Sequence, residues 1–481
     1  MKYFRNIITL LLLVPLASCE KWLAEVPFDK VPGDELYTTE LGVQEALNGL
    51  YLGMLDRSIY GGELTFGLVE ALAQHYYIPD KHRYDSPAAY NLTDSKSAGY
   101  ISEIWSKLYK LIASCNVFIE QVELNKEKYS AAHYKLFRGE AIALRAYLHF
   151  DLFRLFAPAY SESVKTDQAI PYYTKEVNAP GDYASVEDVV AYLLRDLDEA
   201  ITLLSADPLL EDLTIGESFW EYRNFRLNIY AAWVLKARVL LHVGDKPGAY
   251  AIAAALLEGN MPGGSGQAAN FMDVFPSLLS LPTSYRDPVA YTEVIFGMYD
   301  VNRDNIQRDY FSTDLITENI LLTGDTRYAT LFTNNDDTRA KVFQDAPNQS
   351  EVYALKTFSK YLAGRIYDDD PYPYRYNVLP LIKKSEVYLI AAESSDNDTD
   401  KANWLEQLRL GRGYLLHNTE SFVNNLDQLL QDEYEREFYA EGQYIYYLKR
   451  NGKTTVINQR GETVAFNARV LPVPDEEQNN R

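Results

Sequence analysis

The sequence predicts a mostly α-helical fold in which helical hairpins support an irregular, loop-rich half with few short strands. Apolar residues recur at spacings of three and four over several long segments, as in helices that bury one face. One helix–turn–helix segment carries the small residues that are typical of tetratricopeptide hairpins. Between the helical segments lie long stretches without this period, rich in Gly, Pro, Asp, Asn and Tyr. We therefore expect the helices to form the scaffold and the irregular stretches to hold the binding site.

Three helices are expected in the first third of the chain. The first covers residues 41–56, and the second is centred on Ile104–Glu120. The third covers Ala132–Phe156 and ends before Pro158, because proline cannot continue a helix. Its predicted buried stripe keeps helical spacing for the whole length and consists of Phe137, Ala141, Leu144, Leu148, Leu152 and Leu155.

The middle of the chain contains the clearest helical hairpin. A helix begins at Ser185, which forms a capping box with Asp188. The next helix, Asn228–Val243, is closed by Gly244, and a further helix runs to about Glu258. Small residues let the last two helices approach closely, namely Ala237, Ala249 and Ala253. Later helices are expected over Leu379–Glu393, Ala402–Leu410 and Phe422–Gly442.

The irregular stretches form three insertions, near residues 63–99, 259–310 and 322–376. Loops longer than about 15 residues are uncommon inside a compact domain and are usually functional. The chain has 39 Tyr, many of them in these insertions. A sugar ring packs its C–H face on an aromatic ring while its hydroxyls bind amide and charged groups. The candidate ligand-binding residues are Tyr76, Tyr77, Arg83, Tyr84, Tyr90, Asn91, Tyr285, Tyr299, Tyr310, Tyr372 and Tyr374. For any one of these tyrosines the alternative is a place on a helix–helix seam.

The N-terminus has the pattern of a bacterial lipoprotein signal. Basic residues precede an apolar stretch, Ile7–Ala17, that is well below the roughly 20 residues needed to span a bilayer. Small residues then lead to Cys19, the residue that lipoprotein processing acylates. We expect residues 1–18 to be a signal peptide, 19–40 a lipidated tether, and 41–481 the folded domain. The alternative is an ordinary signal peptide with a chance cysteine.

Composition excludes several classes of function. A formal net charge of −22 argues against nucleic-acid binding and against docking on anionic lipid through a basic patch. The lipid anchor is therefore the only expected contact with the membrane. Once Cys19 is lipidated only Cys115 remains, so no intramolecular disulfide is possible. No zinc-protease or nucleophile-elbow motif is present, and the acidic segments near Asp300 and Asp396 lack the Gly and Glu of a calcium loop. We expect no enzyme activity, no cofactor and no metal.

Several motifs, taken in order, resemble the SusD/RagB family of outer-membrane nutrient-binding lipoproteins of Bacteroidetes. They are Ile104-Trp105-x-x-Leu108-Tyr109, Gly139-Glu140-Ala141-x-x-Leu144-Arg145-Ala146, Ser385-Glu386-Val387-Tyr388, Glu435-Arg436-Glu437-Phe438-x-x-Glu441-Gly442 and Leu471-Pro472-Val473-Pro474-x-Glu476. The chain departs from the family pattern over Gln443–Leu448 and at Lys383-Lys384, where an arginine is expected. The resemblance implies about four tetratricopeptide-like hairpins supporting an irregular ligand-binding half. It also implies a TonB-dependent transporter (SusC-like barrel) as partner, over which the protein sits as a lid.

The expected function is a surface-exposed lipoprotein of the outer membrane that captures an oligosaccharide for this transporter. A peptide ligand on the same architecture is the first alternative. A surface glycoside hydrolase and a purely structural interaction module are the alternatives from other classes.

Overall fold

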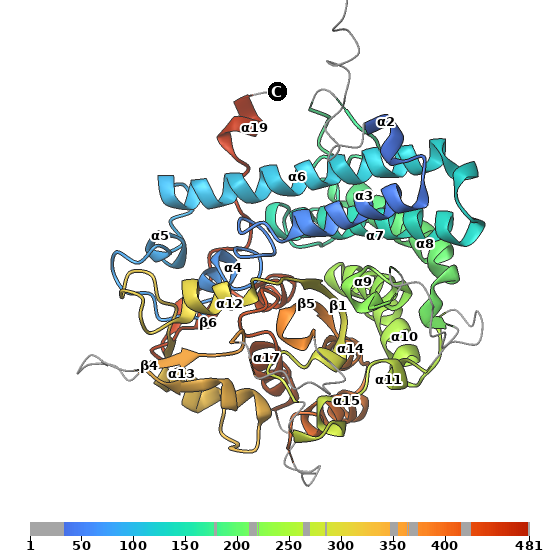
Figure 1. Ribbon diagram of the computed structural model, residues 1–481. Coiled ribbons are helices and arrows are strands. Elements are labelled where there is room, and N and C mark those ends of the chain that lie inside the picture. Colours follow the sequence, from blue (N-terminus) through green and yellow to red (C-terminus); the bar gives the residue numbers. More distant parts are fainter. Residues whose placement is uncertain are drawn as a thin grey trace, which may run out of the picture.

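The computed structural model describes residues 33–177, 180–210, 219, 221–262, 270–283, 286–346, 355–362, 364, 374–414 and 425–479. Helices dominate these residues and the strands are short, which confirms the predicted fold class (Figure 1). The predicted signal peptide, Cys19, Tyr285 and Tyr372 lie outside the described residues. No helix within the described ranges is long and apolar enough to cross a bilayer.

Long helices from the first half of the chain lie side by side along one edge of the molecule (Figure 1). They are α3 (Glu40–Met54), α6 (Ser95–Leu124), α7 (Ala131–Phe156) and α8 (Val186–Leu203). Each begins after a side chain that accepts a backbone N–H, from Thr39, Asp94, Ser130 and Ser185 in turn. Because α6 and α8 cover α7 from both sides, α7 is buried nearly all round over its second half, well beyond the predicted stripe.

A second group of helices forms hairpins below the first. The predicted tetratricopeptide-like pair is α9 (Ile229–His242) and α10 (Lys246–Leu257). Gly244 in its turn has a φ of +82°, which glycine adopts without strain. A further hairpin, α14 (Lys384–Ser394) and α15 (Asp398–Leu410), packs against α10. The chain then continues through α17 (Leu426–Glu437) and α18 (Tyr444–Arg450).

The insertions contain short elements instead of continuous loop. The helices of the insertions are α4 (Leu68–Leu72), α5 (Asp85–Ala88), α11 (Phe271–Val274), α12 (Arg303–Ile306) and α13 (Asp325–Leu331). Two more short helices lie near the chain ends, α2 (Gly33–Leu36) and α19 (Asp475–Asn479). The helix α2 lies within the predicted tether, and the ring of Tyr37 that follows it packs edge-on against Phe118, 5.9 Å between centroids.

Strands from distant parts of the chain pair in three small antiparallel sheets. The longest pair is β1 (Val294–Tyr299) with β5 (Val378–Lys383). A three-stranded sheet has the order β2 (Thr323–Gly324), β4 (Leu355–Phe358), β3 (Phe343–Asp345). A hairpin joins β6 (Thr455–Ile457) and β7 (Thr463–Ala465). The predicted helix Leu379–Glu393 is therefore wrong over its first five residues, which belong to β5.

Buried ion pairs join the C-terminal motif to the irregular half. The Glu437 carboxylate accepts hydrogen bonds from Arg412 at 2.8 Å and from Lys383 at 2.8 Å. Arg412 also binds Glu293 at 2.7 Å. The cations around Glu437 outweigh its burial and hold the pKa of this carboxyl well below its usual range. Removing one partner of such a buried pair leaves the other charge buried without a counterion, which lowers the free energy of unfolding by about 3–5 kcal/mol. The Glu435–Glu441 motif therefore anchors the loops.

Candidate ligand-binding groove

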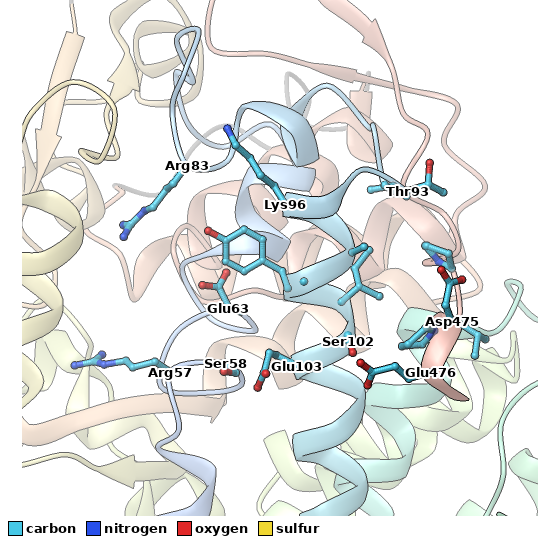
Figure 2. A pocket seen from close by; sticks show the side chains of 18 residues that line it. Arg57, Ser58, Glu63, Arg83, Thr93, Lys96, Ser102, Glu103, Asp475 and Glu476 are labelled. Atoms are coloured by element: carbon cyan, nitrogen blue, oxygen red, sulfur yellow. The ribbon is translucent and has the colours of Figure 1, made fainter. Parts of the chain in front are cut away.

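A half-open groove of about 910 Å³ lies along the N-terminal half of α6. It is bounded by the loop at residues 57–63 and by the C-terminal segment 472–476. Figure 2 shows Ser102 and Glu103 on α6, with residues of both boundaries around them. The volume falls in the range of about 300–1,000 Å³ that is typical of small-ligand sites.

Charged side chains are distributed unevenly across this groove. Arg57 and Arg83 lie on one side of α6, and Asp475 and Glu476 lie on the other (Figure 2). Lys96, on the first turn of α6, is held by Asp85 at 2.9 Å. The groove therefore has its two arginines at one side, with the Glu63 carboxyl beside them, and two further carboxylates at the other side (Figure 2).

Glu63 is a buried carboxyl group in the wall of the groove. One carboxylate oxygen accepts the backbone N–H of Leu68 at 2.8 Å, and the hydroxyl of Tyr84 donates to the group at 3.0 Å. Burial raises the pKa of Glu63 to about 7, and these hydrogen bonds and the nearby Arg83 only partly offset that effect. This side chain can therefore exist in either protonation state near neutral pH.

Arg83 joins the first and second insertions. Its guanidinium lies over the ring of Tyr310 at 4.2 Å and near the ring of Tyr84 at 5.2 Å. Its backbone N–H donates to the carbonyl of Glu318 at 3.0 Å, which fixes the loop. One terminal nitrogen of the guanidinium donates to the carbonyl of Asp309 at 3.4 Å, and the buried Nε has no hydrogen-bond partner among the described residues.

The structure places the other predicted residues of the first insertion away from this groove or beneath its surface. Tyr76 is buried and donates its hydroxyl to the carbonyl of Phe66, and Tyr84 is fully buried behind Glu63. Tyr90, at a φ of +59°, donates to the carbonyl of Leu72. The rings of Tyr76 and Tyr84 thus serve the core and leave no face open.

The remaining predicted residues lie on the surface or behind Arg83. Asn91 is exposed, and half-buried Tyr77 has the guanidinium of Arg460 over its ring at 5.5 Å. Tyr310 is buried beneath Arg83.

Tyr299 and Tyr374, predicted from separate insertions, meet at the surface, with ring centroids 5.7 Å apart. Tyr222, which sequence reasoning missed, packs edge-on against Tyr374 at 4.7 Å and is 45% exposed. Tyr222 also has a φ of +56°, a strained value for a bulky residue. These three residues, the tyrosine cluster, bring one exposed and two half-buried rings together.

Sequence reasoning also missed most residues that line the groove. Arg57 lies just after the first predicted helix, and Tyr100 lies between the first predicted insertion and the second predicted helix, so neither residue belongs to a segment that was predicted to hold the site. The half-exposed ring of Tyr100 lies 5.4 Å from that of Tyr84. In the sequence, the Pro472–Glu476 segment is marked only by its resemblance to a family motif.

Other reactive groups do not form a site. Cys115 is buried on α6, and burial raises the pKa of its thiol to about 12. Within the described ranges, no group of three or more His, Cys, Asp or Glu is placed to hold a metal ion.

Comparison with known proteins gives one consistent family. Residues 27–214 match a SusD-like family model described as starch-binding and associating with the outer membrane. SusD-like protein P38 of Formosa agariphila is 23% identical, over 95% of this chain and 93% of its own length.

Solved structures show that the fold is shared over nearly the whole chain. A putative sugar-binding protein from Bacteroides vulgatus has a TM-score of 0.70 at 20% identity, covering 92% of this chain and 96% of its own. Surface glycan-binding protein A from Bacteroides thetaiotaomicron has a TM-score of 0.62 at 16% identity, covering 92% and 98%. The chain thus resembles the SusD-like family over residues 27–214 and shares the fold of SusD superfamily structures over nearly its whole length.

Proposed function

We propose that the protein is a surface lipoprotein of the outer membrane that binds an oligosaccharide and delivers it to a TonB-dependent transporter. The groove beside α6 is the observation that carries the ligand-binding part. Its volume of about 910 Å³ accommodates more than one sugar ring. Arg57, Arg83 and Glu103 supply donors and acceptors for hydroxyls, and the half-exposed ring of Tyr100 supplies an aromatic face.

The family and the N-terminus support the rest of the proposal. The matching family is described as associating with the outer membrane, and its structural relatives include a putative sugar-binding and a glycan-binding protein. The Leu16–Cys19 sequence is the site at which a lipid would be attached. In this proposal the protein binds without turnover, since no catalytic motif accompanies the groove.

A peptide ligand is the second candidate, and the charge distribution favours it specifically. A short peptide carries a carboxylate and an ammonium group at opposite ends. Arg57 and Arg83 on one side of the groove, with Asp475 and Glu476 on the other, match that pair of charges.

Calorimetry against a glycan panel and a peptide panel tests the proposal. We expect micromolar affinity for one or more oligosaccharides, about −8 kcal/mol, with no products formed. Tyr100→Ala and Arg57→Ala should each weaken binding about tenfold or more, about 1.4 kcal/mol. Tyr250→Ala on α10, outside the residues that line the groove, is the matched control and should bind as the wild type does.

Three outcomes contradict the oligosaccharide proposal. Binding of peptides alone would favour the second candidate. Accumulation of shortened glycans would make the protein a hydrolase. Unchanged glycan binding in both groove variants would exclude the groove, and Tyr222→Ala would then test the tyrosine cluster.

A further inference from the structure

A second cavity lies in the helical hairpins, away from the groove. It has a volume of about 390 Å³ and shares no lining residue with the groove. Leu257 at the end of α10 and Met272 of α11 form one wall. Tyr388 of α14 and four residues of α15 form the other, namely Asp400, Asn403, Trp404 and Gln407. In Figure 1, α11 and α15 lie at the opposite edge of the molecule from α6.

The walls of this cavity combine aromatic rings with unused polar groups. The rings of Tyr388 and Trp404 are 6.3 Å apart and tilted by 51°. The buried indole Nε1 of Trp404 has no hydrogen-bond partner in the part of the chain that the structure describes, which is uncommon for a buried polar atom. The Tyr388 hydroxyl donates to the sulfur of Met272 at 3.9 Å, and sulfur is a weak acceptor.

Short polar side chains of α15 surround these rings. Asn403 and Gln407 are exposed and lie four residues apart, so they project from the same face of the helix. One carboxylate oxygen of Asp400 is held by the amide of Asn397 at 2.9 Å, and the other oxygen remains available as an acceptor. Aromatic rings flanked by two amides and a carboxylate suit a ring that has one apolar face and several hydroxyls.

We propose that this cavity is a second saccharide site, which binds one uncharged sugar ring against Trp404. This inference rests on the proposed function, because it gives the same ligand class a second point of attachment. Among the described residues that line the cavity, Asp400 carries the only formal charge. A uronate or a sulfated sugar would meet a carboxylate and no base, so the site selects neutral sugars. The groove, which contains Arg57 and Arg83, has no such restriction.

Two sites at opposite edges would change how the protein holds a polymer. A long chain that contacts both sites is retained more strongly than a short one, since the second contact is made at high effective concentration. Short oligosaccharides would instead occupy the two sites independently.

Binding to the full mature protein tests the proposal, with maltoheptaose and other neutral oligosaccharides as probes. The background is Tyr100→Ala, which weakens the groove and leaves the second site. In this background we expect residual binding that Trp404→Ala or Asn403→Ala weakens about tenfold or more. Asn403 is exposed, so its replacement does not threaten the fold. Glu406→Ala, on the same helix and outside the cavity, is the control that should leave this binding intact.

Failure of this inference and failure of the proposed function give different results. Loss of all binding in Tyr100→Ala protein would overturn the second site and leave the groove. Binding that Tyr100→Ala does not affect and Trp404→Ala abolishes would overturn the groove and support the second site. If Trp404→Ala alters association with a membrane protein and leaves glycan binding unchanged, the cavity holds a partner's side chain and the inference is wrong.

Discussion

The buried carboxyl group of Glu63, in the wall of the groove, makes the stability of the fold depend on pH. Burial raises the pKa of Glu63 to about 7 from a usual value of 4.5. The folded protein therefore binds more protons than the unfolded chain between these two pH values, and Glu63 reduces stability as the pH rises through this window. In Glu63→Gln this titration is absent. We expect the stability of the variant relative to wild type to improve by about 3 kcal/mol from pH 4.5 to pH 8.

Urea unfolding at both pH values measures this difference. Glutamine can accept the Leu68 N–H and donate to Tyr84, so the variant should keep the local geometry. Glu103→Gln, an exposed change beside the same groove, should follow the wild type at both pH values. A constant difference between Glu63→Gln and wild type would show that Glu63 does not titrate in this range.

Residue type alone could predict that the insertions are rich in tyrosine but not which of these tyrosines lie at a surface. Tyr76, Tyr84 and Tyr310 lie in insertions that looked like binding loops, yet their rings are buried. Tyrosine suits both places, because its ring can pack in the core while its hydroxyl finds one acceptor. Tyr299 and Tyr374 meet only through the pairing of distant segments, which no local pattern encodes.

A lysine from another helix binds the carbonyl groups at the C-terminal end of α7. The Nζ of Lys449, on α18, donates to the carbonyls of Arg154 and Ala157, the latter at 2.6 Å. These carbonyls lie at the end of α7, where a helix leaves acceptors unpaired and favours a positive charge. Lys449→Met would leave both acceptors buried without a partner. We expect it to lower the free energy of unfolding by about 3 kcal/mol.

Guanidinium unfolding and amide hydrogen exchange check this effect together. Exchange should accelerate in the last turn of α7 before it does so elsewhere. Lys453→Met is the control, since this lysine lies four residues further on in a half-exposed position. Equal stability of the two variants would mean that water replaces the Lys449 contacts at no cost.

Elements with a strong period could be predicted, and those formed by long-range pairing could not. The start of α8 at Ser185 was predicted, and its hydroxyl accepts the N–H of Asp188 at 3.1 Å. The apolar run of β5 continues directly into α14, so the sequence pattern predicts one helix over both segments. Pro380 inside that run was the available sign, since proline disfavours a helix interior. The partner strand of β5, β1, lies about 80 residues earlier in the chain.

At the scale of the whole molecule, a binding protein needs a route for its ligand. None of the described helices is long and apolar enough to span a bilayer. The proposed lipid on Cys19 would hold the protein at the membrane surface. Attachment at one point also keeps the protein at high effective concentration near a transporter, so a modest contact energy suffices for repeated opening and closing. The broad faces of the helical hairpins suit such a contact.

We therefore expect the protein to copurify with a large TonB-dependent barrel after mild detergent extraction of native membranes. Cys19→Ala should move the protein to the soluble fraction and reduce the recovered barrel, because the acyl chains supply membrane affinity at about 0.8 kcal/mol per buried methylene. Fatty-acid labelling of wild type and Cys19→Ala, with mass spectrometry of the purified complexes, measures both effects. Wild type, which keeps Cys19, is the anchored control that should retain the barrel. Repeated recovery of the chain alone, even after cross-linking, would remove the transporter from the proposal and leave a surface glycan binder.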